Sequence, residues 1–306
     1  MNKLVVLGSV NADHVLQVPS FPRPGETLHG KNYQVIPGGK GANQAVAAAR
    51  LGANIGFIAC VGDDAFGRTI RDSFAEDGIN IDGVTIAAGT PTGIAMIQVA
   101  DSGENSICIA PEANAKLTAA TVSAHLDAIQ AADYLLTQLE TPIEGIELAL
   151  KTAKDAGTKV ILNPAPAHAL SDQLLACVDI ITPNETEAEV LTGIKVMDDA
   201  SAGLAAKALH AKGIGIVMVT LGAKGVFLST AGEGEIIPGF KVTATDTTAA
   251  GDTFNGALVT ALLENKPLLS AIKFAHAAAA ISVTRFGAQT SIPSRIEVDK
   301  FLIKHS

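Results

Sequence analysis

The segment around Asp252 carries the strongest chemical signal in the sequence. It reads Asp246-Thr-Thr-Ala-Ala-Gly-Asp-Thr-Phe-Asn-Gly256 and leads into the Ala- and Leu-rich residues 256–263, which are typical of a helix. The free N–H groups and positive dipole end of a helix start bind anions. A carboxylate there would repel an anion unless it has its own task, such as accepting a proton from an attacking hydroxyl in phosphoryl transfer. On spacing alone, a simple helix cap explains Asp252 equally well.

Two further clusters contain residues suited to a polyol. Gly38-Gly-Lys-Gly-Ala-Asn43 opens an Ala-rich segment, and its Lys40 and Asn43 offer hydrogen bonds beside a backbone that a ligand can approach closely. Asn11 and Asp13 follow the first predicted strand, and their spacing points them the same way, which suits neighbouring sugar hydroxyls. An ordinary Gly-rich loop and an Asx turn remain the plainer explanations.

Another two clusters suit a nucleotide. Thr182-Pro-Asn184-Glu-Thr-Glu187 lies at a predicted strand-to-helix junction, where Asn and Glu side chains could hold hydrated Mg²⁺ and phosphate, although a capped helix with an acidic first turn is common. Thr220-Leu-Gly222-Ala-Lys224-Gly225 is a turn between two strand-like runs, and a plain hairpin is favoured there unless a nucleotide is near. All these clusters fall at ends of successive predicted strands, the layout expected of one site.

The segments that must position these residues alternate between strand and helix. Short aliphatic runs predict strands at 4–10, 54–61, 134–139, 159–162, 178–181 and 216–221. Helices are expected at 41–51, at 64–77, from an N-cap at Thr141 with Pro142 as first helical residue to Gly157, within 251–284, and near 293–303. This alternation predicts an α/β fold with a doubly wound, mostly parallel central sheet flanked by helices.

Two extended segments interrupt the alternation. Residues 14–36 contain three prolines, and residues 92–110 form a predicted hairpin around 101–105. These segments could pair as a small β-sheet that covers the carboxyl ends of the core strands as a lid. Two surface hairpins without function explain the pattern equally well. We treat residues 1–306 as a single α/β domain that carries this lid.

Composition excludes several classes of protein. The chain has 306 residues, of which 48% are hydrophobic, so it can bury a full-sized core. Its formal net charge of −9 disfavours nucleic acid and anionic membranes as partners. The longest uncharged stretch, 83–100, is interrupted by Gly and Pro and is a poor membrane span. Three isolated cysteines and the lack of a signal peptide point to a cytoplasmic protein.

Absent motifs narrow the chemistry further. The chain contains no Walker-type phosphate loop, no Gly-x-Ser-x-Gly elbow and no His-Glu-x-x-His. The first predicted strand leads into Gly8-Ser-Val-Asn-Ala-Asp13 and not into Gly-x-Gly-x-x-Gly, which nearly excludes a Rossmann-type dehydrogenase.

From Leu4-Val-Val-Leu-Gly-Ser-Val-Asn-Ala-Asp13 to Ala288-Gln-Thr-Ser291, the sequence closely resembles the PfkB-type carbohydrate kinases, in particular those that phosphorylate ribose. Both signature regions are present, Gly38-Gly-Lys-Gly-Ala-Asn-Gln-Ala45 and Asp246–Asp252. The resemblance implies ATP-dependent phosphorylation of D-ribose at its 5-hydroxyl by a homodimer that pairs through its β lid. The alternatives are a kinase for another small sugar or a nucleoside, or a non-catalytic sugar or nucleotide sensor. The retained Asp252, Asn184 and Glu187 argue against the sensor.

The resemblance also assigns roles to individual residues. Asp252 is implied as the catalytic base, and the anion hole for the transferring phosphoryl group as the N–H groups of Ala249, Ala250, Gly251 and Asp252. The implied ribose-binding residues are Asn11, Asp13, Gly39, Lys40, Gly41, Ala42, Asn43, Glu140 and Asp252. The implied ATP-binding residues are Asn184, Thr220, Leu221, Gly222, Ala223, Lys224, Gly225, Gly251 and His276.

Two cation sites are implied as well. Glu187 is expected to act indirectly on Mg²⁺. The implied K⁺ loop comprises Asp246, Thr248, Ser282, Arg285, Gly287 and Ser291, several of them through backbone carbonyls. The chain departs from the usual family pattern at Ala249, where most members have Gly. An Ala is acceptable there if its φ is negative, and the change bears only on how closely the backbone can approach the phosphate.

Overall fold

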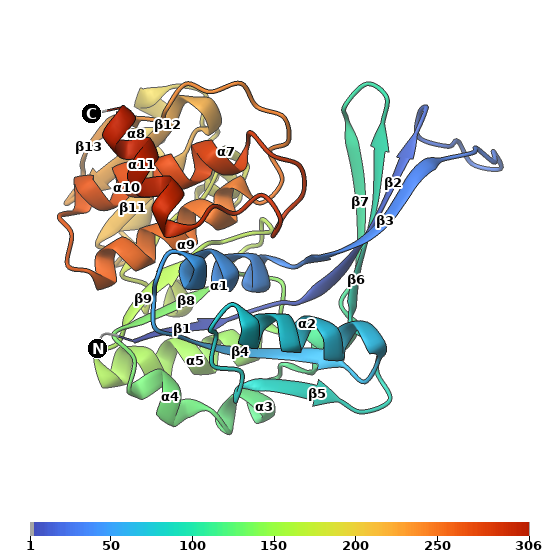
Figure 1. The fold of residues 1–306 in the computed structure, drawn as a ribbon. Helices are drawn as coiled ribbons and strands as arrows, with labels where there is room; N and C mark the ends of the chain where they lie inside the picture. Colours follow the sequence, from blue (N-terminus) through green and yellow to red (C-terminus); the bar gives the residue numbers. More distant parts are fainter. Residues whose placement is uncertain (1–2, 306) are drawn as a thin grey trace.

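The computed structural model describes residues 3–305, and its main element is a nine-stranded sheet (Figure 1). The strand order is β13-β12-β11-β10-β9-β8-β1-β4-β5. All neighbours are parallel except at one edge, where β11, β12 and β13 pair antiparallel. The strands are β1 (Leu4–Leu7), β4 (Ile55–Gly62), β5 (Val84–Ala87), β8 (Tyr134–Thr137), β9 (Lys159–Leu162), β10 (Ile180–Ile181), β11 (Ile216–Thr220), β12 (Gly225–Thr230) and β13 (Glu233–Pro238).

The core lies on both faces of this sheet. Every residue of β1 is buried, with Leu4 and Val6 in one apolar cluster and Val5 and Leu7 in the other. Aliphatic strands of this kind are typical of parallel sheets that helices cover on both sides. The predicted doubly wound α/β fold is confirmed.

The helices divide between the two faces according to these clusters. The first cluster holds residues of α1 (Lys40–Arg50), α2 (Ala65–Glu76), α9 (Ala250–Leu263), α10 (Leu268–Ser282) and α11 (Arg295–Lys304). The second holds residues of α3 (Ala119–Ser123), α4 (Leu126–Gln130), α5 (Ile143–Ala156), α6 (Asp172–Leu175), α7 (Glu185–Thr192) and α8 (Asp199–His210). Among residues 3–305, every helix is too short or too polar to span a bilayer.

A separate four-stranded sheet projects from the main body in Figure 1. Its order is β3-β2-β6-β7, in which β2 (Asn11–Val18) and β6 (Gly93–Ala100) are parallel, while β3 (Lys31–Gly38) and β7 (Asn105–Ala110) are antiparallel to their neighbours. The two extended segments of the sequence therefore pair with each other, as expected. We call this sheet the lid sheet.

Three local predictions were wrong. The predicted first strand at 4–10 ends at Leu7, and residues 11–18 form a strand of the other sheet, so Asn11 and Asp13 do not form an Asx turn. Pro142 keeps an extended ψ of 131° and is the N-cap itself, so α5 begins at Ile143. The hydroxyl of Thr141 has no hydrogen-bond partner among the described residues.

Candidate active site

Two backbone N–H groups in the first turn of α9 and that of its N-cap Ala249 have no acceptor among the described residues, whereas the Ala250 N–H, also predicted for the anion hole, is already paired. The Ala250 N–H donates to the Thr247 carbonyl at 3.3 Å and the Thr253 N–H to the Ala249 carbonyl at 2.8 Å. Between them, the N–H groups of Gly251 and Asp252 have no acceptor among residues 3–305. They lie at the positive end of a 14-residue helix, where unpaired donors attract anions. The turn thus has the properties of an anion site.

Ala249 does not meet the condition under which Ala is accepted without strain. Its φ is +58° and its ψ 14°, which is the left-handed region. A residue with a Cβ atom loses about 1–2 kcal/mol in this conformation. The turn accepts this cost because the chain must reverse at residue 249 to start the helix at Ala250.

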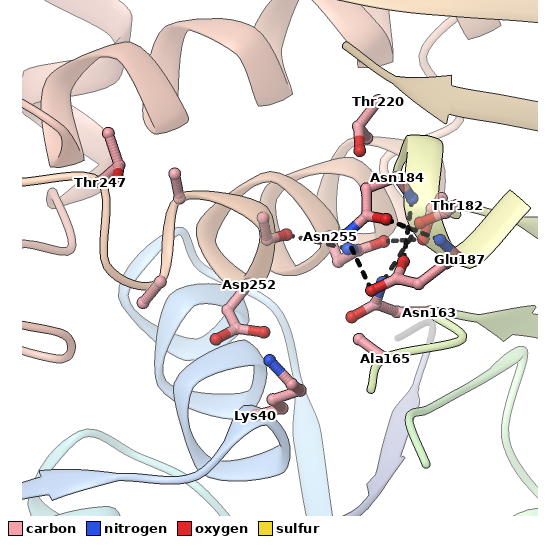
Figure 2. A pocket seen from close by; sticks show the side chains of 13 residues that line it. Lys40, Asn163, Ala165, Thr182, Asn184, Glu187, Thr220, Thr247, Asp252 and Asn255 are labelled. Atoms are coloured by element: carbon pink, nitrogen blue, oxygen red, sulfur yellow. Dashed lines mark hydrogen bonds between the residues drawn. The ribbon is translucent and has the colours of Figure 1, made fainter. Parts of the chain in front are cut away.

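A cavity of about 230 Å³ opens in front of this turn (Figure 2). It joins the start of α9 to the start of α7 and to the carboxyl ends of β9, β10 and β11. Thirteen residues line it: Lys40, Asn163, Ala165, Thr182, Asn184, Glu187, Thr220, Thr247, Ala249, Ala250, Gly251, Asp252 and Asn255. Residues from four of the predicted clusters therefore meet at one edge of the sheet, where parallel α/β sheets bind ligands.

Asp252 is a buried carboxylate, not a helix cap. Its side chain is 7% exposed, and no side chain caps α9. Asn43 Nδ2 donates to Asp252 Oδ2 at 3.0 Å, and Gln44 Nε2 donates to Oδ1 at 2.9 Å. Figure 2 shows the Lys40 side chain pointing toward the same carboxylate. The α1 amides thus hold Asp252 at the mouth of the anion site, which contradicts the plain cap.

The predicted sugar-binding residues gather beside Asp252. Glu140 Oε2 accepts hydrogen bonds from Ser9 Oγ at 2.5 Å and from the Lys40 N–H at 3.0 Å. Asn11 Oδ1 accepts one from Asn114 Nδ2 at 2.8 Å. Glu140 therefore fixes the start of the Gly-rich loop, and Asn114 fixes the first polar residue of the lid strand.

The Gly-rich loop approaches the first strand closely. Gly39 has a φ of +90° and is the N-cap of α1, while the Ala42 N–H donates to the Ser9 carbonyl at 2.9 Å. A Cβ atom on Gly41 would collide with the backbone of Gly8 and Ser9. Both glycines are required by this geometry, so the loop is a packed part of the site and not an ordinary mobile loop.

The charges of this region perturb one another. Burial, followed by the neighbouring charges of Glu140 and Asp252, raises the pKa of Asp13 from 3.8 to about 7. Burial alone would lower the pKa of Lys40, but the surrounding carboxylates outweigh it and raise that pKa above its usual value. A strongly perturbed carboxyl beside a single lysine is typical of a functional site.

Asn184 and Glu187 form a helix cap at the edge of the cavity. Asn184 Oδ1 accepts from the Glu187 N–H at 2.8 Å, and Glu187 Oε2 accepts from the Asn184 N–H at 2.9 Å, a complete capping box. Both residues also line the cavity. Burial raises the pKa of Glu187, while the Asn184 N–H and Lys40 oppose the rise. The capped helix is confirmed, while the role of the same two residues toward Mg²⁺ and phosphate stays a prediction.

A model of pfkB family carbohydrate kinases matches residues 1–295. The chain belongs to the pfkB family. The ribokinase of Haemophilus influenzae is 59% identical over 299 residues, which are 98% of each chain. A solved ribokinase from Thermotoga maritima has 41% identity and a TM-score of 0.90 over 99% of this chain and 100% of its own. The Arabidopsis thaliana ribokinase complexed with ribose and ATP has 35% identity and a TM-score of 0.93 over 99% of each.

Several residues that the resemblance to pfkB kinases implied do not line the cavity. Of the loop at 220–225 only Thr220 lines it, while Gly222, Ala223 and Lys224 are exposed, Leu221 is half-buried and Gly225 is buried. His276 lies on α10 and packs on Phe254, with ring centroids 5.4 Å apart. Burial lowers the pKa of His276 to about 4, so its imidazole is neutral at pH 7. Its role in ATP binding stays a prediction.

The implied K⁺ loop is a clamp between two chain segments. The Thr245 N–H donates to the Val283 carbonyl at 2.7 Å, and Asp246 Oδ2 accepts from the Gly287 N–H at 2.9 Å. The other oxygen of Asp246 accepts from the N–H and hydroxyl of Thr248. Asp246 therefore closes the clamp, and an ion between the segments would depend on backbone carbonyls. Oxygen donors of this kind suit a hard monovalent cation.

The remaining side chains of that loop have partners of their own. Ser282 Oγ and Ser291 Oγ each donate to a carbonyl three residues earlier, and Arg285 pairs with Glu297 at 2.5 Å. Residues 3–305 contain no cluster of three or more acidic, His or Cys side chains that could hold a metal alone. Any cation here needs carbonyl or ligand oxygens in addition.

Five polar residues in or next to the cavity are ones to which the sequence motifs assign no role. Each follows a strand or lies within a recognised motif, but none had been assigned a role: Gln44, Gln138, Asn163, Thr182 and Asn255. Three of them share a pattern that a sequence can show: an amide or hydroxyl side chain directly after an aliphatic strand, at positions 138, 163 and 182. Such a position places the side chain at the ligand-binding edge of the sheet.

Proposed function

We propose that this chain transfers the γ-phosphoryl group of ATP to the 5-hydroxyl of D-ribose and so forms D-ribose 5-phosphate and ADP. One observation carries the proposal: a buried carboxylate, Asp252, lies in the same cavity as two unpaired N–H groups at a helix start. A base and an anion site in contact are what phosphoryl transfer to an alcohol requires. The similarity to ribokinases over the whole chain supports ribose as the acceptor.

The reaction follows from this arrangement. Asp252 removes the proton of the acceptor hydroxyl as its oxygen attacks the γ-phosphorus. The bond between that phosphorus and the ADP oxygen breaks in line with the attack, and the proton on Asp252 returns to solvent. The N–H groups of Gly251 and Asp252 stabilise the charge on the transferring phosphoryl group.

The sugar is held between the lid sheet and α1. We assign its polar contacts to Asn11 and Asp13 on β2, to residues 39–43, and to Glu140. Support comes from electrostatic coupling, since Asp13 interacts with Glu140, Asp252 and Lys40 at once. The polar residues of β2 and the base Asp252 would therefore contact the same ligand. Closing the lid sheet over it would exclude water from the reaction.

ATP is placed along α7 and the 220–225 turn, with Asn184 beside its phosphates. The Asn184–Glu187 pair fits hydrated Mg²⁺, because a single carboxylate with free lone pairs suits an ion that keeps most of its waters. Mg²⁺ would neutralise phosphate charge, and K⁺ in the clamp at Asp246 would stabilise the adjacent turn.

The assembly is proposed to be a homodimer through the lid sheet. Five large apolar side chains of that sheet are exposed: Tyr33, Val35, Met96, Ile107 and Ile109. Exposed apolar groups on a sheet with two edges favour contact with a second copy. The three cysteines are free, which agrees with the proposed cytoplasmic location.

The deciding experiment is an ADP-release assay with ATP across a panel of sugars and nucleosides, in K⁺ and then in Na⁺. We expect turnover with D-ribose and faster turnover in K⁺. Asp252→Asn should bind ribose and nucleotide but lose about 10²–10⁴-fold in kcat. Absence of turnover with ribose would refute the substrate, near-normal kcat in Asp252→Asn would refute the base, and equal rates in both salts would refute only the K⁺ site.

A further inference from the structure

A chain of buried amides surrounds Asp252. Gln44 has no exposed surface and Gln138 is 1% exposed. Gln44 Nε2 donates to Asp252 Oδ1 at 2.9 Å and to Asn163 Oδ1 at 3.0 Å, and Gln44 Oε1 accepts from Gln138 Nε2 at 2.6 Å. Both N–H donors and the carbonyl oxygen of the Gln44 amide therefore have partners.

The polarity of this chain depends on the charge of Asp252. An ionised carboxylate only accepts hydrogen bonds, so the NH₂ group of Gln44 must face it and the carbonyl of Gln44 must face the NH₂ group of Gln138. A flipped Gln44 amide would point its oxygen at two acceptors, Asp252 and Asn163. Gln44 thus matches the ionised form of Asp252, the form that can take a proton.

The same chain continues to the anion site. Asn163 Nδ2 donates to the Thr182 carbonyl at 3.2 Å, and the Thr182 hydroxyl donates to Asn255 Oδ1 at 2.7 Å. Asn255 Nδ2 then donates to the Gly251 carbonyl at 2.8 Å. Figure 2 shows Asn163, Thr182 and Asn255 together on one side of the cavity. A continuous set of hydrogen bonds therefore joins Asp252 to the turn that carries the unpaired N–H groups.

We infer that Gln44 is a positioning residue for the reaction: held by Gln138 and Asn163, it orients the Asp252 carboxylate and stabilises its ionised form. The inference rests on the proposed role of Asp252 as the base. Three other charged groups interact with this carboxylate, namely Lys40 on α1, Glu187 on α7 and Asp13 on β2, while Glu140 after β8 interacts with Asp13 and Lys40. Gln44 differs from them because it contacts the carboxylate directly and carries no charge.

The main test is Gln44→Met, which keeps the length of the side chain and removes its donors. We expect kcat to fall about 10–100-fold, the loss typical of a hydrogen bond to a charged group, while KM for ribose changes less than about twofold. The acid limb of the kcat–pH profile should move to higher pH, because the ionised form of the base loses a donor. Unchanged kcat together with an unchanged acid limb would overturn the inference.

A double variant distinguishes an effect of Gln44 that acts through Asp252 from a general loss of activity. If Gln44 acts through Asp252, adding Gln44→Met to Asp252→Asn should change the residual kcat little. An equal loss in both backgrounds would overturn the inference. The proposed function fails separately, if the wild type shows no turnover with ribose; normal turnover in Asp252→Asn would refute the base and this inference with it.

A second variant and a control cover a loss of stability. Gln44→Glu places an isosteric carboxyl against Asp252, so the two groups should share a proton and the acid limb should move further up in pH. An acid limb that does not move would contradict the inference. Thr158→Val is the matched control, because it removes two hydrogen bonds of a buried side chain at the opposite end of β9. It should lower Tm and leave kcat unchanged, which shows that lost stability alone does not reproduce the Gln44 effect.

Discussion

Replacing Asp13 by Asn should stabilise the protein in a pH-dependent way. The Asp13 side chain is 7% exposed, and its carboxylate has no hydrogen-bond donor among residues 3–305. Burial and the charges of Glu140 and Asp252 raise its pKa to about 7. Asn has nearly the same size, carries no charge and sacrifices no hydrogen bond, so the substitution isolates the cost of burying this charge.

The size and sign of the effect follow from the pKa change. A rise from 3.8 in the unfolded chain to about 7 in the folded protein is about three units, or about 4 kcal/mol at 1.36 kcal/mol per unit. Because the folded state holds the proton more tightly, wild-type stability is complete below about pH 4 and declines as the pH rises to about 7. The stability of the Asn variant does not decline in this way, because Asn has no proton to lose at this position. At about 2 °C per kcal/mol for a chain of this size, its Tm advantage reaches about 8 °C above neutral pH.

The assay is thermal unfolding of both proteins, without sugar, from about pH 5 to about pH 8. The difference in Tm should grow up to about pH 7 and then level off. Asp13→Asn should also raise KM for ribose because Asp13 contacts the sugar in the proposed complex. The exposed Asp72 offers a matched control, since Asp72→Asn should show no growing difference. A Tm difference that stays constant with pH, or favours the wild type at pH 8, would refute the reasoning.

Two other predictions concern the phosphate turn and the lid sheet. Ala249→Gly should raise the free energy of unfolding by up to about 1 kcal/mol, because relief of the positive φ outweighs the added freedom of the unfolded chain; a drop in chemical or thermal stability would contradict this. The wild type should be dimeric by light scattering. Met96 and Ile107 are exposed on opposite faces of the lid sheet, so Met96→Glu and Ile107→Glu each place a charge on one face. The variant whose charge falls on the face that pairs should be a monomer. A wild-type monomer, or a dimer that survives both changes, would refute lid pairing.

Most of the fold could be predicted because its signals are local. The helix starting at the Gly-rich loop and the aliphatic strand at 159–162 each follow from a short run of residues. The first strand was overextended because Leu4–Val10 is apolar throughout, yet the chain leaves the core sheet after Leu7. The turn at Gly8 is dictated by a distant contact, since a Cβ there would come within 2.7 Å of the Gly41 Cα. No local pattern reports such a contact.

The candidate site was predictable in its charged members and in the amides of its motifs, such as Asn43 and Asn184, but not in the buried amides that surround Asp252. Asp252 and Lys40 stood out because a charge in a turn of small residues needs a reason. Gln44 lies inside a recognised motif, but its partner Asp252 is 208 residues away and Gln138 is 94 residues away. The conformation of Ala249 was also out of reach, because the left-handed region is one that Ala rarely adopts.

The charge of the cavity explains why the site must combine backbone donors with cations. Its side chains present one positive group, Lys40, against the lining carboxylates of Asp252 and Glu187, with Asp13 and Glu140 close behind. These carboxylates already neutralise the lysine, so it adds little attraction for a triphosphate. What remains is the helix start at Gly251, worth about half a positive charge, and metal ions that arrive with or beside the nucleotide. A protein with a net charge of −9 can therefore act on ATP, since backbone dipoles and bound cations act only within the cavity.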